Sequence, residues 1–169
     1  MNLRSWFEWM HALPSAIAMR EGLYTYPILL TVHVLTLLMF AGLVVMMDLR
    51  LVGLAYRDTP FSQVQKRLFP WQMVAMVLTT IVGFLLFYSQ PMRYYGKALY
   101  WLKMGLIVVA GVNAMVFHFT TYRSVAKWDA DAGPPLGAKV AGVLSLALWA
   151  MIVVFGRLTA YGWLTSEYY

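Results

Sequence analysis

Four long apolar runs constrain the fold of this chain more than any other feature of its sequence. They cover residues 26–47, 68–88, 98–122 and 140–164, and few polar side chains interrupt them. A helix rises about 1.5 Å per residue and needs roughly 20 residues to cross a bilayer, so each run is long enough. The alternation of apolar and polar residues that a membrane β-barrel requires is missing. The sequence therefore predicts one domain of four transmembrane helices over residues 26–164.

The segments between the runs are polar or contain helix-breaking residues. Ser89-Gln90-Pro91 follows the second run, and Gly133-Pro134-Pro135 precedes the fourth. Connections this short favour an up-down-up-down bundle, which makes the fold class an all-α membrane protein. Only 12% of the residues are charged, against about 25% in a typical soluble domain, and 62% are hydrophobic. This composition excludes an ordinary soluble protein, and the absence of cysteine excludes disulfides, thiolate zinc sites and iron–sulfur clusters.

Residues 1–25 form an N-terminal segment of a different character. They carry four charged side chains and lack the apolar core of a secretory signal. The segment predicts an amphipathic helix that lies in the membrane interface until Pro14 breaks it. Its large apolar residues recur at helical spacing: Trp6, Trp9, Met10 and Leu13. At the other terminus, residues 165–169 are predicted to form a short tail.

Lysine and arginine are distributed unequally between the two sides of the predicted membrane. Segments 48–67 and 123–139 hold seven of them, whereas the N-terminal segment and the second loop hold four. Positive loops stay in the cytoplasm, so both termini are predicted to face the periplasm of a bacterial inner membrane. The net charge of +6 is therefore interpreted as a topology signal and not as a nucleic-acid-binding surface.

Three basic side chains are predicted to lie at one depth in the bilayer. His33 lies seven residues into the first helix, Lys103 five residues into the third, and Arg157 seven residues before the end of the fourth. In an up-down-up-down bundle these positions are all roughly 10 Å below the outer interface. Because this layer holds no acidic residue, we expect it to bind an anion or an anionic cofactor.

A b-type haem suits this layer, because His33 supplies an imidazole ligand for the iron. The second axial ligand is either Lys103 or His11 folded in from the N-terminal segment. Arg157 keeps its proton and would neutralise a haem propionate. His33 and His118 cannot share one haem, because they lie about 22 Å apart along the bundle. In the alternative interpretation, Lys103 and Arg157 extend to lipid phosphates and His33 bonds to a neighbouring backbone.

A second set of metal donors lies near the cytoplasmic end of the predicted bundle. Met47, Met115 and His118 offer two thioethers and an imidazole, which is a set that suits Cu(I). Copper handling or transport is therefore the alternative function. Methionine is also a common space-filler of apolar cores, which favours packing as the explanation of the same residues.

The remaining polar residues of the helices have structural explanations. Asp48 is expected to pair with Arg50, Arg123 or His118, and Asn113 is expected to make an interhelical hydrogen bond. No nucleophile–base–carboxylate set or phosphate loop is visible in the sequence. We therefore expect no independent enzyme, and if the chain has an enzymatic activity, it should be that of a membrane oxidoreductase.

Several short motifs resemble the CopD-like superfamily of four-helix bacterial inner-membrane proteins. The first predicted helix resembles that of the superfamily in Thr31-Val32-His33-Val34-Leu35, Ala41-Gly42 and Asp48-Leu49-Arg50-Leu51. Ile81-Val82-Gly83-Phe84-Leu85 resembles its second helix, and Tyr100-Trp101-Leu102-Lys103-Met104 resembles the W-x-x-K opening of its third. Residues 113–118, with Tyr122-Arg123, resemble one of its uncharacterised branches.

The resemblance implies both candidate functions. The superfamily includes the copper-resistance D proteins, which implies copper handling, and the HemJ-type protoporphyrinogen oxidases. In the latter, a His in helix one and a Lys in helix three are associated with haem, and they correspond to His33 and Lys103. The chain differs from these oxidases in its N-terminal extension, its longer third loop and Arg157. The leading hypothesis is thus a haem b protein that transfers electrons with other membrane or periplasmic redox subunits, and a non-catalytic scaffold is the third.

Overall fold

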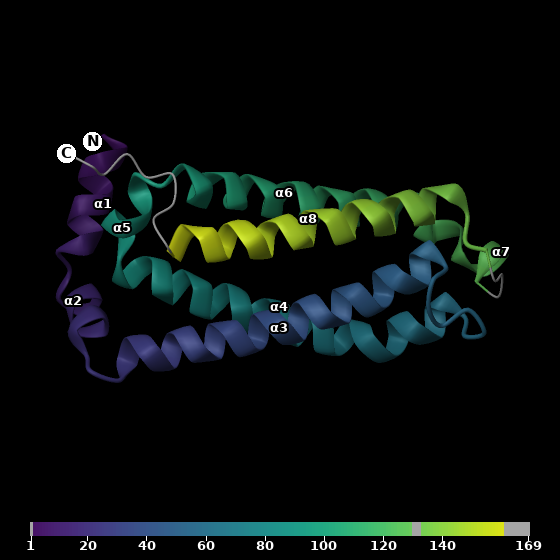
Figure 1. Cartoon of the computed structure of the whole chain (residues 1–169), viewed down its shortest axis with the longest axis horizontal. Helices are drawn as coiled ribbons and strands as arrows, with labels where there is room; N and C mark the ends of the chain where they lie inside the picture. The colour runs from purple at the N-terminus through teal and green to yellow at the C-terminus, as the bar shows by residue number, and fades with distance from the viewer. Residues whose placement is uncertain (1, 130–132, 161–169) are drawn as a thin grey trace.

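The computed structural model describes residues 2–129 and 133–160, and no strand occurs within these ranges. Its long helices are α3 (Thr25–Val52), α4 (Phe61–Ser89), α6 (Ala98–Phe119) and α8 (Leu136–Ala160). Each of them is long and apolar enough to cross a membrane. Successive long helices run in opposite directions (Figure 1). The predicted all-α, four-helix bundle of a multi-pass membrane protein is therefore confirmed.

The first two long helices extend beyond the predicted apolar runs. α3 continues five residues past Met47, to Val52. The next residue, Gly53, takes a left-handed conformation with φ 84°. The Gly53 N–H bonds the Leu49 carbonyl at 3.1 Å, which satisfies one of the last carbonyls of the helix. α4 begins seven residues before the predicted Leu68. Apolar runs mark the part of a helix that lies in lipid, whereas the backbone hydrogen bonds continue into the interface.

The last two long helices differ less from the prediction. α6 ends three residues before the predicted end, and α8 begins directly after Pro135, four residues before the predicted start. Proline lacks a backbone N–H and has a fixed φ that suits the start of a helix. The predicted end of the fourth helix at Leu164 and the tail 165–169 lie outside the described residues.

Two short helices, α1 (Leu3–His11) and α2 (Pro14–Glu21), lie across one end of the bundle (Figure 1). α1 packs against α5 (Pro91–Tyr95), and α2 packs against α3 and α4. The predicted break at Pro14 is confirmed, because this residue begins α2. The buried residues of α1 are Phe7 and Met10, whereas Trp6 and Trp9 are exposed. We call the end that α1, α2 and α5 cover the capped end.

At the opposite end, which we call the loop end, the start of α4 contacts the segment that follows α6. That segment contains a 3-10 turn, η1 (Tyr122–Ser124), and α7 (Val125–Trp128). Arg50 is fully buried and donates from Nε to the Thr59 carbonyl at 2.8 Å. The Asp129 carboxylate accepts the Ser62 N–H at 2.7 Å and so caps the start of α4 from a distant part of the chain.

The long helices pack as two antiparallel pairs. α3 lies along α4, α6 lies along α8, and contacts between α3 and α8 join the two pairs (Figure 1). Between α6 and α8, the Asn113 amide donates to the Ala141 carbonyl at 3.0 Å, which confirms the predicted interhelical bond. Between α3 and α8, a Cβ on Gly142 would lie 3.1 Å from the Asp48 carbonyl oxygen. Glycine therefore allows these two backbones to approach closely, as small residues do in membrane bundles.

Candidate functional site

His33 lies on α3 with its imidazole against the backbone of α4. A Cβ on Gly83 would lie 2.9 Å from Cε1 of the ring, so only glycine admits the ring this closely. The ring also forms a hydrogen bond with the Thr79 backbone, one turn earlier on α4, which agrees with the alternative interpretation that His33 bonds to a neighbouring helix. Nδ1 is buried and has no hydrogen-bonding partner among the described residues. Because a buried polar atom without a partner is costly and rare, this nitrogen is a candidate ligand atom.

Lys103 approaches His33 from α6. Its ammonium group lies 5.2 Å from the centroid of the Tyr100 ring and close enough to His33 to interact with it electrostatically. The Lys103 stem passes α8, where Cδ is 3.5 Å from the position of a Cβ on Gly156. His33 and Lys103 thus lie within electrostatic range of each other, and each lies against a glycine on a neighbouring helix.

Arg157 follows Gly156 on α8 and lies at the level of this pair. Consecutive helical residues project about 100° apart, so Arg157 and Gly156 face different directions. The side chain of Arg157 is exposed. The structure therefore places the third predicted residue at the level of Lys103, with its side chain on the exposed surface of α8.

Three tyrosines from three helices, Tyr26, Tyr94 and Tyr100, form a connected group, and Tyr100 lies beside Lys103. The rings of Tyr94 and Tyr100 are 4.9 Å apart between centroids, and the Tyr94 hydroxyl forms a hydrogen bond with Tyr26. The pKa of Tyr94 is raised to about 12, chiefly by burial and also by the interactions with Tyr26. Tyr94 therefore keeps its proton near neutral pH and remains a hydrogen-bond donor. The three residues stand at the ends of predicted spans, where belt tyrosines also stand, so the sequence could not separate the two roles.

A comparison with protein families shows which family the chain belongs to. A model described as a family of unknown function, DUF6644, matches residues 6–162. The chain belongs to this family. The match includes His33, Gly83, Lys103 and Gly156, so it covers each long helix that contributes to the site. No curated protein and no solved structure matches the chain.

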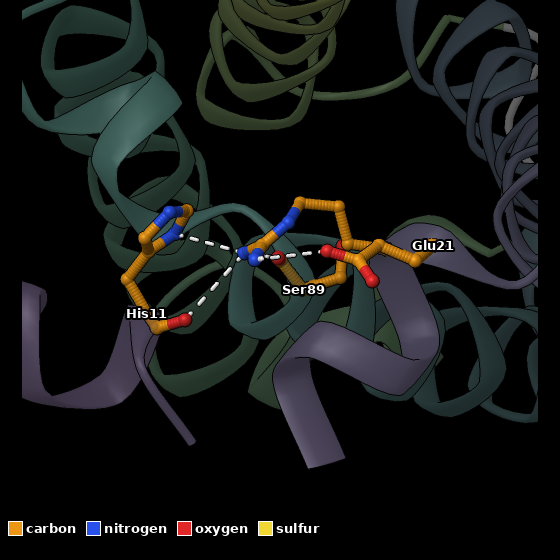
Figure 2. A network of polar contacts seen from close by, with 4 residues as sticks. His11, Glu21 and Ser89 are labelled. Atoms are coloured by element: carbon orange, nitrogen blue, oxygen red, sulfur yellow. Dashed lines mark hydrogen bonds and ion pairs between the residues drawn. The ribbon is translucent and has the colours of Figure 1, made fainter. Parts of the chain in front are cut away.

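His11 does not join the His33 layer. Figure 2 shows it at the capped end, where Arg20 Nη1 lies 3.1 Å from His11 Nδ1 and also reaches the carbonyl oxygens of His11 and Ser89 at 3.5 Å. Glu21 lies 3.9 Å from the same guanidinium group. Ser89 is six residues beyond Gly83, which corresponds to about 9 Å along α4. In this structure the His11 ring is therefore engaged by Arg20 at the level of Ser89, and the structure does not bring His11 to the His33 ring.

The proposed copper donors are not assembled. Met47 packs into the cluster of Leu51, Phe61, Trp128 and Ala138 at the loop end. Met115 is 58% exposed on the outer surface of α6, and His118 is exposed and stacks on Tyr122 at 5.3 Å. One thioether therefore faces the interior and the other faces outward, so the predicted set of Met47, Met115 and His118 does not form a common site.

Asp48 also differs from the expectation. It is buried, and it makes no ion pair with Arg50, Arg123 or His118 in the part of the chain that the structure describes. Its carboxyl group instead forms a hydrogen bond with Ser145 of α8, and its Oδ2 atom has no partner among the described residues. Arg50, one of the expected partners of Asp48, instead donates to the backbone carbonyls of Thr59 and Asp129, which sequence spacing does not predict.

Proposed function

We propose that this chain binds a b-type haem inside its helix bundle and transfers electrons as a subunit or partner of a larger redox complex. One observation carries the proposal: the Nδ1 atom of the half-buried His33 ring is itself buried without a partner in the described ranges, and Lys103 lies within electrostatic range of the ring. The resemblance to CopD-like proteins, in which the corresponding His and Lys are associated with haem, agrees with this observation.

The donor set fits haem better than it fits a bare metal ion. No group of three His, Cys, Asp or Glu side chains that could hold a metal occurs among the described residues. A bare ion would therefore find too few strong ligands from the protein. Haem iron takes most of its ligands from the porphyrin and needs only one or two axial donors. His33 supplies an imidazole, and Lys103 supplies an amine that can ligate when it is deprotonated.

The surrounding residues would hold and shield such a group. Bound haem would supply a one-electron redox centre. His33 and Lys103 would hold the iron of such a group, and the exposed guanidinium group of Arg157, at the same level, would pair with a propionate. The neutral Tyr94 hydroxyl would remain a hydrogen-bond donor near the site. Phe7, whose ring lies 5.6 Å from Phe87, packs over the capped end and reduces the access of water from that side.

The charge distribution supports an orientation for this function. Because segments 48–67 and 123–139 hold seven of the lysines and arginines counted above, we place the loop end in the cytoplasm of a bacterial inner membrane. The capped end, and with it the His33 layer, would then lie on the periplasmic side. A redox partner in the membrane or the periplasm would therefore be nearest to the site.

The absorption spectrum of the purified protein tests the proposal. We expect a Soret band and reducible α and β bands in the wild type, and no bound haem in His33→Ala. His118→Ala is the matched control, because it removes an exposed imidazole at the loop end and should leave the haem content unchanged. A well-folded wild-type protein without haem, or a His33→Ala protein with wild-type haem content, would contradict the proposal.

The second axial ligand has its own test. Lys103→Met keeps much of the side-chain volume but removes the nitrogen, so the spectrum should shift toward a high-spin form. His11→Ala should leave the spectrum unchanged, because Arg20 holds His11 away from the layer. A shift in His11→Ala with none in Lys103→Met would reverse this assignment.

A further inference from the structure

The buried polar atoms that lack a partner are concentrated on one pair of helices. Among the described residues they include His33 and Asp48 on α3, and Gln65, Gln72 and Thr79 on α4. No such atom lies on the described parts of α6 or α8. Because a buried polar group without a partner costs free energy, a cluster of them on one pair of helices requires an explanation.

The three residues on α4 follow a regular spacing. Gln65, Gln72 and Thr79 are seven residues apart, so they lie on nearly the same face of the helix. This stripe is about 21 Å long, which is much of the roughly 30 Å hydrocarbon core of a bilayer. It ends where the Thr79 backbone meets the His33 ring.

α3 supplies a titratable group at each end of the same stripe. His33 and Asp48 are fifteen residues apart, or about 22 Å along α3. Because α3 and α4 are antiparallel neighbours and His33 lies beside Thr79, Asp48 lies at the level of Gln65. The imidazole thus lies at one end of the stripe, whereas the acid lies level with its other end, with its carboxyl group bonded to Ser145 of α8.

The stripe begins at an opening on the surface. A pocket of about 460 Å³ at the loop end is lined by residues that include Gln65, Lys66 and Pro70. Pro70 has no N–H, so the Lys66 carbonyl lacks its helical donor and offers another polar atom at this pocket. Water that enters here would meet Gln65 first.

We propose that the inner face of α4 carries a chain of water molecules through which protons pass between the loop-end pocket and the His33 site. About three waters would bridge each 10 Å interval between the polar side chains at ordinary hydrogen-bond spacing. Gln65 and Gln72 hold waters with their amides, and the Thr79 hydroxyl both accepts and donates. A proton that enters at the pocket is passed from one oxygen to the next, and each oxygen releases one proton as it accepts another, so no other group is consumed.

This inference rests on the burial and spacing of the polar groups and not on haem binding. It predicts a function for α4, whereas the haem proposal concerns His33 and Lys103. A protein without haem would therefore not contradict the water path. Likewise, a face of α4 without water would not contradict the haem proposal.

Adjacent threonines on α4 give a matched test of the path. Thr79 has a buried hydroxyl without a partner in the described chain, whereas Thr80 is exposed on the outer face and donates to the Met76 carbonyl at 2.8 Å. The chain has no cysteine, so Thr79→Cys, Thr80→Cys and Gln72→Cys would each carry a single thiol. In lipid vesicles, a small, charged methanethiosulfonate should modify Thr79→Cys and Gln72→Cys at least tenfold faster than Thr80→Cys. Equal or slower modification at positions 72 and 79 would overturn the proposal.

Deuterium exchange at the imidazole C2 carbon tests whether the path reaches His33. Mass spectrometry can follow it separately in His33, His11 and His118, the three histidines of the chain. Gln72→Leu or Thr79→Val should slow the exchange of His33 severalfold, while His118 exchanges at the wild-type rate as a check on folding. Thr80→Val is the control and should not slow it. An unchanged His33 rate in both blocking variants would overturn the path.

Discussion

The helix pairs α3–α4 and α6–α8 differ in how their buried polar groups are satisfied. Between α6 and α8, Asn113 donates to the Ala141 carbonyl at 3.0 Å, and the bond joins two helices. On α3 and α4, the side chains of His33, Gln72 and Thr79 each have a buried atom without a partner in the described chain. Polar groups that are paired stabilise a bundle, whereas unpaired ones cost free energy and persist where a function needs them.

This difference suggests a division of roles within one bundle. The α6–α8 pair acts mainly as a support. It carries Lys103, whose side chain passes Gly156 of α8. The α3–α4 pair carries His33 and the polar stripe of α4. Fixed apolar clusters, such as Phe40 and Val44 against Ala75, hold the α3–α4 seam between the polar positions. The following variants are ordered from the largest expected effect to the smallest.

Gly83→Val should have the largest effect, because it acts on the seam beneath His33. Its Cβ alone would lie 2.9 Å from the imidazole Cε1, so the ring or the helix must move. We expect a loss of about 1–3 kcal/mol in unfolding free energy and a loss of bound haem. Gly111→Val on α6 is the control, because a Cβ there meets nothing within 4 Å. Equal effects of the two variants on unfolding temperature and haem content would remove the distinction between the pairs.

Asn113→Leu should have a smaller effect and act on stability alone. The change removes the bond to the Ala141 carbonyl, and interhelical hydrogen bonds in membrane bundles contribute about 1 kcal/mol. Denaturant titration in detergent should show a lower unfolding free energy, and the haem spectrum should be unchanged. A large loss of haem in this variant would mean that the α6–α8 pair contributes more to the site than support.

Tyr94 links the two helix pairs, because it contacts Tyr26 of α3 and Tyr100 of α6. Its pKa is raised to about 12 in the fold, above its ordinary value near 10, so the folded state favours the neutral phenol. The resulting stability is present below about pH 10 and is lost as the pH rises toward 12. Tyr94→Phe should therefore make the unfolding temperature fall less steeply between pH 10 and 12. An identical slope in both proteins would contradict this assignment.

The sequence predicted the fold well because the apolar runs state directly which segments can lie in lipid. It also predicted that His33 and Lys103 share a depth, since the rise of a helix converts residue number into position along the bundle. Neither inference requires knowledge of how a helix is rotated about its axis. That is why Arg157 was placed at the correct depth while the direction of its side chain was not predicted.

The contacts that the sequence missed depend on which helix faces meet. Gly83 lies beneath His33 only because α4 turns that face to α3, and His11 is held by Arg20 only because α2 folds back against α1. The seven-residue spacing of Gln65, Gln72 and Thr79 is visible in the sequence, but its burial becomes apparent only in the packed bundle.

The most direct test of the division of roles compares haem content and unfolding temperature in the same preparations of the wild type, His33→Ala and Asn113→Leu. The account predicts that His33→Ala loses its haem while its helices stay folded, and that Asn113→Leu keeps its haem but unfolds at a lower temperature. Wild-type haem content in His33→Ala, with haem lost from Asn113→Leu, would contradict it.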